Sequence, residues 1–94
     1  MFVMMADFEL LDGAEEGFLQ WFAESNEALA GAEGLVSRRL MRSPAGGFRV
    51  VVEHKTRQTL EAMIQSPAHE RVHPAGRSFM RDEPVRRLYE VVAP

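Results

Sequence analysis

The sequence contains no cysteine among its 94 residues. A chain without cysteine has no disulfide framework, no thiolate metal site and no cysteine nucleophile. Basic residues are also few, because 11 Lys and Arg stand against 14 Asp and Glu and leave a net charge of −3. This balance offers no clustered positive surface for nucleic acid, so we expect no nucleic-acid partner.

Long uninterrupted apolar runs are lacking as well. The apolar start, "MFVMMADFEL", has no basic residue ahead of it and is interrupted by Asp7 and Glu9. It matches neither a signal peptide nor a membrane span, so we expect no membrane partner and a cytoplasmic location. The length and the charged fraction of 27% are typical of one globular domain over residues 1–94.

Alternation and helical spacing predict the secondary structure. A strand is expected over residues 2–11, followed by a helix that Asp12 caps and that carries Phe18, Trp21, Phe22 and Leu29 at helical spacing. Strands over 35–42 and 48–54 flank the hairpin loop "SPAGG".

The second half of the chain continues the pattern. Thr56 is expected to cap a second helix, and Ser66 with Pro67 is expected to open a short helical turn that Pro74 and Gly76 close. A loop and a last strand over 85–92 complete the chain.

This order predicts an α+β, ferredoxin-like βαββαβ fold: a four-stranded antiparallel sheet with its helices on one face. The uncovered face would then carry apolar residues among charged ones: Val3, Met5, Val36, Leu40, Val51, Leu88 and Val92. Each such side chain left in water forgoes roughly 1.5–3 kcal/mol, and contiguous apolar surface usually marks an interface. We therefore expect a two-fold homodimer with its sheets packed face to face.

The stretch "HERVH", residues 69–73, matches the H-E-x-x-H pattern, in which two histidines one helical turn apart bind zinc. A zinc site also needs a third protein ligand and a rigid helix. Here the predicted helix is barely two turns long, and no further histidine follows it. We expect no metal, and His69 and His73 are first interpreted as surface or rim residues.

Four segments together resemble the antibiotic biosynthesis monooxygenase family: "MFVMMADFEL", "AEGLVSRRLMRSP", "TLEAMIQSPAHERVH" and "LYEVV". The resemblance covers almost the whole chain, and the segments follow in the same order. It implies a dimeric α+β barrel, in agreement with the homodimer expected above.

The resemblance implies two activities. Some members are cofactor-free monooxygenases that convert polyketide-type phenols to quinones with molecular oxygen. Others bind and degrade haem with an asparagine on the first strand, a tryptophan on the second helix and a histidine on the short helix that follows. His73 falls at that histidine position, where neutral imidazole would ligate iron. Ala6 and Met63 stand where the asparagine and tryptophan would be.

The space between helices and sheet is the expected substrate pocket. Its predicted lining is Phe2, Met4, Ala6, Phe8, Trp21, Phe22 and Met63. These apolar residues would form either an adaptable pocket for a small apolar or aromatic ligand or a filled core. His73, His54 and Tyr89 are the candidate catalytic residues.

Three functions follow from these expectations. The first is a monooxygenase that acts on a small aromatic or polyketide-like substrate without a cofactor. The second is a haem-binding or haem-degrading protein with His73 as axial ligand. The third is a dimeric binding domain that has kept the fold and lost the chemistry, which the departures at Ala6 and Met63 favour.

Overall fold

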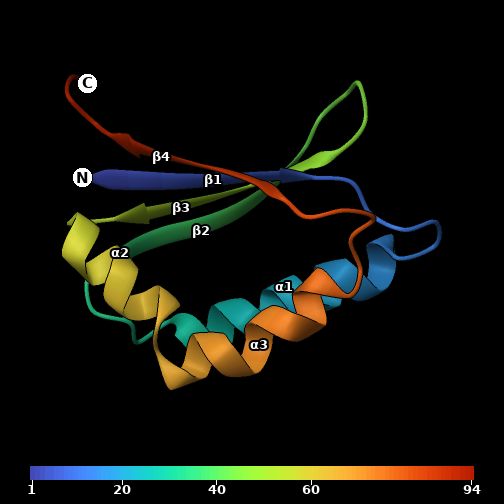
Figure 1. Cartoon of the computed structure of the whole chain (residues 1–94), viewed down its shortest axis with the longest axis horizontal. Coiled ribbons are helices and arrows are strands. Elements are labelled where there is room, and N and C mark those ends of the chain that lie inside the picture. The colour runs from blue at the N-terminus through green and yellow to red at the C-terminus, as the bar shows by residue number, and fades with distance from the viewer.

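A computed structural model describes all residues 1–94 as four strands and three helices (Figure 1). In chain order they are β1 (Phe2–Phe8), α1 (Glu15–Leu29), β2 (Leu35–Arg42), β3 (Phe48–His54), α2 (Arg57–Ile64), α3 (Pro67–Arg77) and β4 (Val85–Glu90). The strands form one sheet in the order β2-β3-β1-β4, and every neighbouring pair is antiparallel. The predicted ferredoxin-like α+β fold is confirmed.

The molecule has two layers (Figure 1). All three helices lie on one side of the sheet, and the other side is open. The loop between β2 and β3 and the residues after β4 both rise away from the helices. No helix has the length and apolar composition needed to cross a membrane.

The core lies between the two layers. The aromatic stripe of α1 faces the sheet as its spacing predicted, and Phe18 and Phe22 are buried. The ring of Phe18 packs 5.2 Å from that of Phe8 on β1. A second cluster joins the end of α1 to α2, and its buried members are Leu29, Val52, Leu60 and Met63.

Side-chain caps fix where α2 and α3 begin. The backbone N–H of Thr59 donates to Thr56 Oγ1 at 3.1 Å, and that of His69 donates to Ser66 Oγ at 3.2 Å, so both predicted caps are confirmed. The predicted cap at Asp12 was wrong. Helix α1 starts at Glu15 with Ala14 as its N-cap and without a side-chain cap, and the Asp12 carboxylate instead pairs with Arg81.

Helix α3 continues past Pro74 to Arg77, whereas the sequence predicted that it would close there. A proline at this position removes only the hydrogen bond to the carbonyl of Glu70, one turn earlier. Both residues are exposed, so water can satisfy that carbonyl. The consequence is that Arg77 belongs to the helix rather than to a loop.

A β-bulge at the start of β2 reverses the faces predicted for that strand. The pairing with β3 shifts between Leu35 and Ser37, which leaves Val36 out of the ladder. Beyond the bulge, Arg38 reaches helix α1, so that Arg38 and Leu40 both lie on the helix-covered face. The placement of Leu40 on the open face was wrong, because one extra residue moves every later side chain across the sheet.

The faces of β4 were also misassigned. Leu88 pairs directly with Met4, which packs against the core beneath the helices, so Leu88 lies on the covered face rather than the open one. The strand ends at Glu90, and Val92 lies beyond it.

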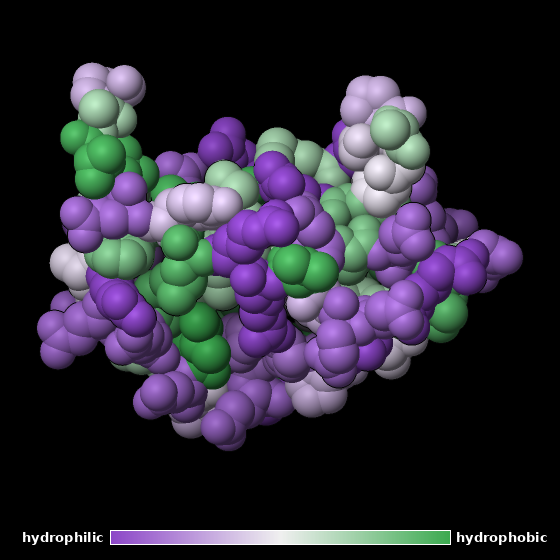
Figure 2. Space-filling view, turned by 45° about the horizontal axis from the view of Figure 1, so that its top comes forward, coloured by the Kyte–Doolittle hydropathy of each residue, from purple (hydrophilic) through white to green (hydrophobic).

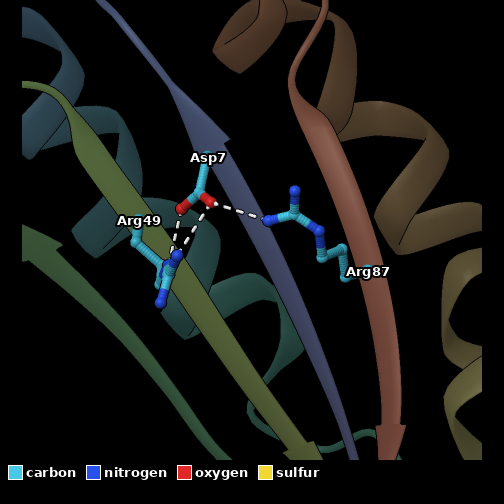
Figure 3. A network of polar contacts seen from close by, with 3 residues as sticks. All are labelled: Asp7, Arg49 and Arg87. Carbon is cyan, nitrogen blue, oxygen red and sulfur yellow. Dashed lines mark hydrogen bonds and ion pairs between the residues drawn. The ribbon is translucent and has the colours of Figure 1, made fainter.

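The open face carries apolar and charged side chains together (Figure 2). Val3 and Met5 lie on it as predicted, beside Tyr89 of β4. Near the end of β1, Asp7 accepts two hydrogen bonds from Arg49 of β3, at 2.6 and 2.9 Å (Figure 3). Arg87 of β4 approaches the same carboxylate from the other side at 3.6 Å. This face is therefore an ion-pair network set among apolar residues.

Candidate active site

A cavity of about 80 Å³ lies between the sheet and the helices. Every strand and every helix contributes to its wall, which consists of Met4, Ala6, Phe8, Phe18, Trp21, Arg38, Val50, Val52, Met63, Ile64, His69, His73, Arg77, Met80, Pro84 and Arg86. The predicted pocket residues Met4, Ala6, Phe8, Trp21 and Met63 are among them.

The other two predicted pocket residues lie elsewhere. Phe2 sits at the end of β1, with the guanidinium of Arg57 5.9 Å from its ring centre. Phe22 is buried beneath Arg38, whose guanidinium lies 5.0 Å from its ring centre. Phe22 therefore supports the wall from behind rather than facing the cavity.

The position of Trp21 in the wall is fixed from two directions. Its Nε1 donates a hydrogen bond of 2.9 Å to the carbonyl oxygen of Val72 on α3. Gly76 lies directly against the indole, and a Cβ at that position would overlap the ring. A glycine is required there because α1 and α3 approach each other at the tryptophan.

His69 and His73 lie four residues apart on α3, so the helix presents both to the cavity. Their rings stack with centroids 5.2 Å apart and planes inclined by 24°. No group of three His, Asp or Glu side chains with metal-binding geometry occurs in the chain. The pair is thus two imidazoles in contact, without the third ligand that a zinc site requires.

His73 is held by an arginine. The distance from Arg86 Nη2 to His73 Nε2 is 2.8 Å, and a guanidinium only donates, so Nε2 accepts and the ring carries its proton on Nδ1. Burial and the charge of Arg86 lower the pKa of His73, since both disfavour the imidazolium. His73 is accordingly neutral at pH 7, with its Nε2 lone pair occupied.

His69 is neutral for the same reasons, more strongly expressed. Burial, then the neighbouring His73 and the guanidinium groups of Arg38 and Arg86, lower the pKa of His69 to about 4. Its ring forms no hydrogen bond to another side chain. Its free lone pair in the cavity wall can accept a proton from a bound molecule, but with a pKa of about 4 the imidazole is a weak base at neutral pH.

Three arginines complete the polar part of the wall, and sequence reasoning missed all of them. Arg38 comes from β2, Arg77 from the end of α3 and Arg86 from β4. Burial lowers the pKa of Arg38 to about 10. Arg38 was missed because the bulge in β2 places it on the covered face, and the sequence of β2 alone carries no signal of that bulge.

The other two candidate catalytic residues are not brought to the cavity. His54 is fully buried between Thr59 and Met63, at 3.1 Å from the Thr59 hydroxyl and 3.3 Å from the Met63 sulfur. Burial lowers its pKa. Tyr89 is half exposed on the open face, directly opposite Val3.

The antibiotic biosynthesis monooxygenase family model matches residues 1–75. That match spans most of the chain, which therefore belongs to the antibiotic biosynthesis monooxygenase family. No curated protein matches the sequence.

Solved structures share the fold over nearly the whole chain. SnoaB from Streptomyces nogalater, described as a cofactor-independent oxygenase and solved as an asparagine-to-alanine mutant, has 16% identity and a TM-score of 0.87, with 99% of this chain and 91% of that chain covered. Rv0793 from Mycobacterium tuberculosis has 16% identity and a TM-score of 0.84, with 99% and 96% covered. An antibiotic biosynthesis monooxygenase at 18% identity has a TM-score of 0.84, with 99% and 100% covered. At these identities the likeness establishes the fold.

A haem group does not fit this site. The Nε2 atom of His73, which would ligate iron, accepts a hydrogen bond from Arg86 at 2.8 Å. A cavity of about 80 Å³ is also far below the several hundred Å³ typical of ligand pockets, and a porphyrin is a large ligand. The asparagine and tryptophan that the resemblance to haem degraders would require are replaced by Ala6 and Met63, which both line this cavity.

Proposed function

We propose that this protein is a cofactor-independent monooxygenase that oxidises a small phenolic or polyketide-like aromatic compound in the cavity beneath the helices. The single observation that carries the proposal is the stacked pair of neutral imidazoles, His69 and His73, facing an otherwise largely apolar chamber. Family membership and the description of SnoaB as a cofactor-independent oxygenase support the same reaction class.

The proposed reaction begins with the removal of a proton from the substrate, so it requires a base. Removing the proton of a phenol or hydroquinone leaves an electron-rich anion, which molecular oxygen oxidises directly. With a phenol, naphthol or anthrone, one oxygen atom enters the product and the other leaves as water, and the substrate supplies all four electrons as it becomes a quinone. A hydroquinone that gains one oxygen atom in the same way becomes a hydroxyquinone, again with release of water. His69, whose lone pair is free, takes the proton, while His73 is held in place by Arg86.

The apolar wall would hold the aromatic ring. Trp21, Phe8 and Phe18 form one aromatic corner of the cavity, and Met63 and Met80 supply deformable side chains. Because the cavity measures about 80 Å³, a substrate would enter only as these side chains move apart.

Oxygen consumption tests the proposal. Purified protein is supplied with a panel of hydroquinones, naphthols and anthrones at pH 7.5, and an oxygen electrode records uptake above the autoxidation rate. We expect uptake with at least one compound and a drop of about 10²–10⁴-fold in His69→Phe, the range for a lost general base. Tyr89→Phe, on the open face, serves as the control and should match the wild type. No uptake with any compound contradicts the proposal.

A binding domain without chemistry is the second candidate. The observation that favours it is the small cavity, since pockets for drug-sized ligands usually measure about 300–1,000 Å³. Ligand binding without any oxygen consumption would support this alternative.

We also propose that two copies associate through their open faces. Val85 and Tyr89 of β4 and Met41 of β2 are exposed there at 55%, 47% and 43%. Burying apolar side chains of this kind stabilises association by roughly 25 cal/mol per Å² of apolar surface. Light scattering at micromolar concentration should give twice the chain mass of 10.6 kDa, and a monomer at all concentrations would contradict the proposal.

A further inference from the structure

The cavity wall has a one-sided charge. Of its 16 residues three are arginines and two are histidines, and none is an aspartate or a glutamate. The chain as a whole has the opposite balance, with 14 acidic and 11 basic residues. Positive groups are therefore concentrated where the fold excludes carboxylates.

Two of the three cavity arginines, Arg38 and Arg86, lack the acidic partners that most other arginines have. Seven arginines form ion pairs with Asp or Glu side chains: Arg39, Arg42, Arg49, Arg57, Arg77, Arg81 and Arg87. The remaining arginines are Arg38, Arg71 and Arg86. Arg71 is exposed to solvent on α3, whereas Arg38 and Arg86 both line the cavity.

The side chain of Arg38 is held in place by hydrogen bonds, unlike a mobile surface arginine. Its Nη1 donates to Ser25 Oγ at 2.9 Å and to Asn26 Oδ1 at 2.6 Å, which fixes one edge of the guanidinium against α1. Its Nε is buried and has no hydrogen-bond partner. A guanidinium that is fixed in place, removed from water and left with an unpaired N–H group destabilises the folded protein unless an anion accepts its hydrogen bond.

Arg77 and Arg86 contribute two further guanidinium groups to the cavity wall. Arg77 Nε is also buried without a partner, although its Nη2 lies 3.2 Å from Glu83 outside the wall. Arg86, on the exposed edge strand, directs one nitrogen at His73.

We infer that the cavity binds a carboxylate attached to an apolar ring, with the carboxylate at Arg38 and Arg86 and the ring against Trp21. Guanidinium groups bind carboxylate and phosphate alike. Ten of the 16 wall residues are hydrophobic, and this majority selects an anion with an apolar body over a free inorganic ion. That the acid is also the substrate rests on the proposed monooxygenase function, but its binding does not.

Binding of the anion would also act on the histidines. Arg38 and Arg86 are among the charges that hold down the pKa of His69. A bound carboxylate offsets those charges and brings His69 closer to the basicity of a useful proton acceptor at neutral pH. The carboxylate of the ligand would thus raise the pKa of His69, the imidazole that faces the ligand's ring.

Trp21 provides the readout, because it is the only tryptophan in the chain and lies in the cavity wall. Benzoate, benzamide and inorganic phosphate are titrated separately while the indole fluorescence, excited at a wavelength these probes do not absorb, is recorded. We expect benzoate to bind at least tenfold more tightly than benzamide, and phosphate to leave the fluorescence unchanged.

Variants assign the effect to residues. Arg38→Gln should weaken benzoate binding at least tenfold and leave benzamide unaffected. Arg86→Gln, at the exposed edge of the sheet, should act in the same direction and tests the inference even where Arg38→Gln does not fold. Arg71→Gln removes an arginine of the same chain outside the cavity and should leave both affinities unchanged.

Several results would overturn the inference: no response to benzoate, equal affinity for benzoate and benzamide, saturable binding of phosphate, or benzoate binding that survives in both cavity variants. The proposed function fails by a different measurement. Charge-selective binding with no oxygen uptake from any hydroquinone, acidic or neutral, removes the monooxygenase and keeps the anion site. Oxygen uptake with neutral hydroquinones and no preference for benzoate over benzamide removes the anion site and keeps the monooxygenase.

Discussion

Arginine side chains on the two faces of the sheet have different kinds of partner. On the open face, Arg49 and Arg87 share Asp7 between them (Figure 3). On the same face, Arg39 pairs with Glu53 at 3.0 Å. On the covered face, Arg38 and Arg86 meet only neutral partners: a serine, an asparagine and a histidine.

The comparison distinguishes arginines whose charge is neutralised within the chain from arginines whose charge is available to a ligand. An ion pair on the open face is complete within the chain and leaves little for another molecule to neutralise. An unpaired guanidinium beneath the helices is incomplete, and the covered location strengthens any interaction it makes. This difference supports the proposals of ligand binding on the covered face and assembly through the open face.

The largest expected effect concerns stability of the covered face. Phe18 is fully buried among the rings of Phe8, Trp21 and Phe79, so Phe18→Ala should lower the free energy of unfolding by about 3–5 kcal/mol. Leu19→Ala, the next residue on the same helix, is the control, because Leu19 is 44% exposed and should change stability by about 0.5 kcal/mol at most. Urea unfolding measures both, and equal losses would contradict the assignment of the core.

The contact between α3 and Trp21 comes second. Gly76→Ala places a Cβ into the indole, and overpacking of this kind costs about 1–3 kcal/mol. The displaced ring should also shift its fluorescence maximum. Gly31→Ala is the matched control, since a Cβ there meets nothing within 4 Å. An unchanged spectrum in Gly76→Ala would show that Trp21 does not pack on this helix.

On the open face, Asp7→Asn should cause a smaller loss than Gly76→Ala. The substitution leaves Arg49 and Arg87 facing one carboxamide, and hydrogen bonding to Arg49 is the main reason that the pKa of Asp7 is lowered. Asp12→Asn removes an ion pair from a carboxylate that is 97% exposed and should change the melting temperature less. Benzoate affinity should be unaffected in both, and a change with Asp7→Asn would join the two faces functionally.

The smallest expected effect is a dependence on mild acid. Burial lowers the pKa of His54, His69 and His73, so the unfolded chain takes up protons first as the pH falls below the ordinary histidine value of 6.5. Stability should therefore be full above pH 6.5 and decline toward pH 4, where His69 itself titrates. His69→Phe should flatten part of this decline in a series of urea titrations. A decline that begins only below pH 4 would point to carboxylates such as Asp7 instead.

Local patterns were enough to predict most of the fold. The order of the elements, the aromatic stripe of α1 and the caps at Thr56 and Ser66 all depend on residues close in sequence, and the structure confirms each of them. The apolar half of the cavity followed from the same periodicity, since Met4, Ala6 and Phe8 alternate along β1.

The polar half of the cavity depended on contacts between distant segments. The sequence did not predict Arg38 in the cavity because the bulge in β2 changes the face of that residue. Arg77 was missed because α3 continues past Pro74, and Arg86 was missed because its position depends on the register of β4 against β1. Bulges and registers arise from strand pairing, which a single segment does not reveal. His69 gained its importance from the same tertiary arrangement, because the charges around it come from β2 and β4.

The chain carries its own reporters for the two faces in its six methionines. Three line the cavity, namely Met4, Met63 and Met80, and three lie outside it, namely Met1, Met5 and Met41. With the methionine methyl groups labelled with ¹³C, an anaerobic titration with a hydroquinone should shift the first three signals and leave the others in place. Shifts confined to Met5 and Met41, with the cavity signals unmoved, would show that small aromatic molecules bind on the open face and not beneath the helices.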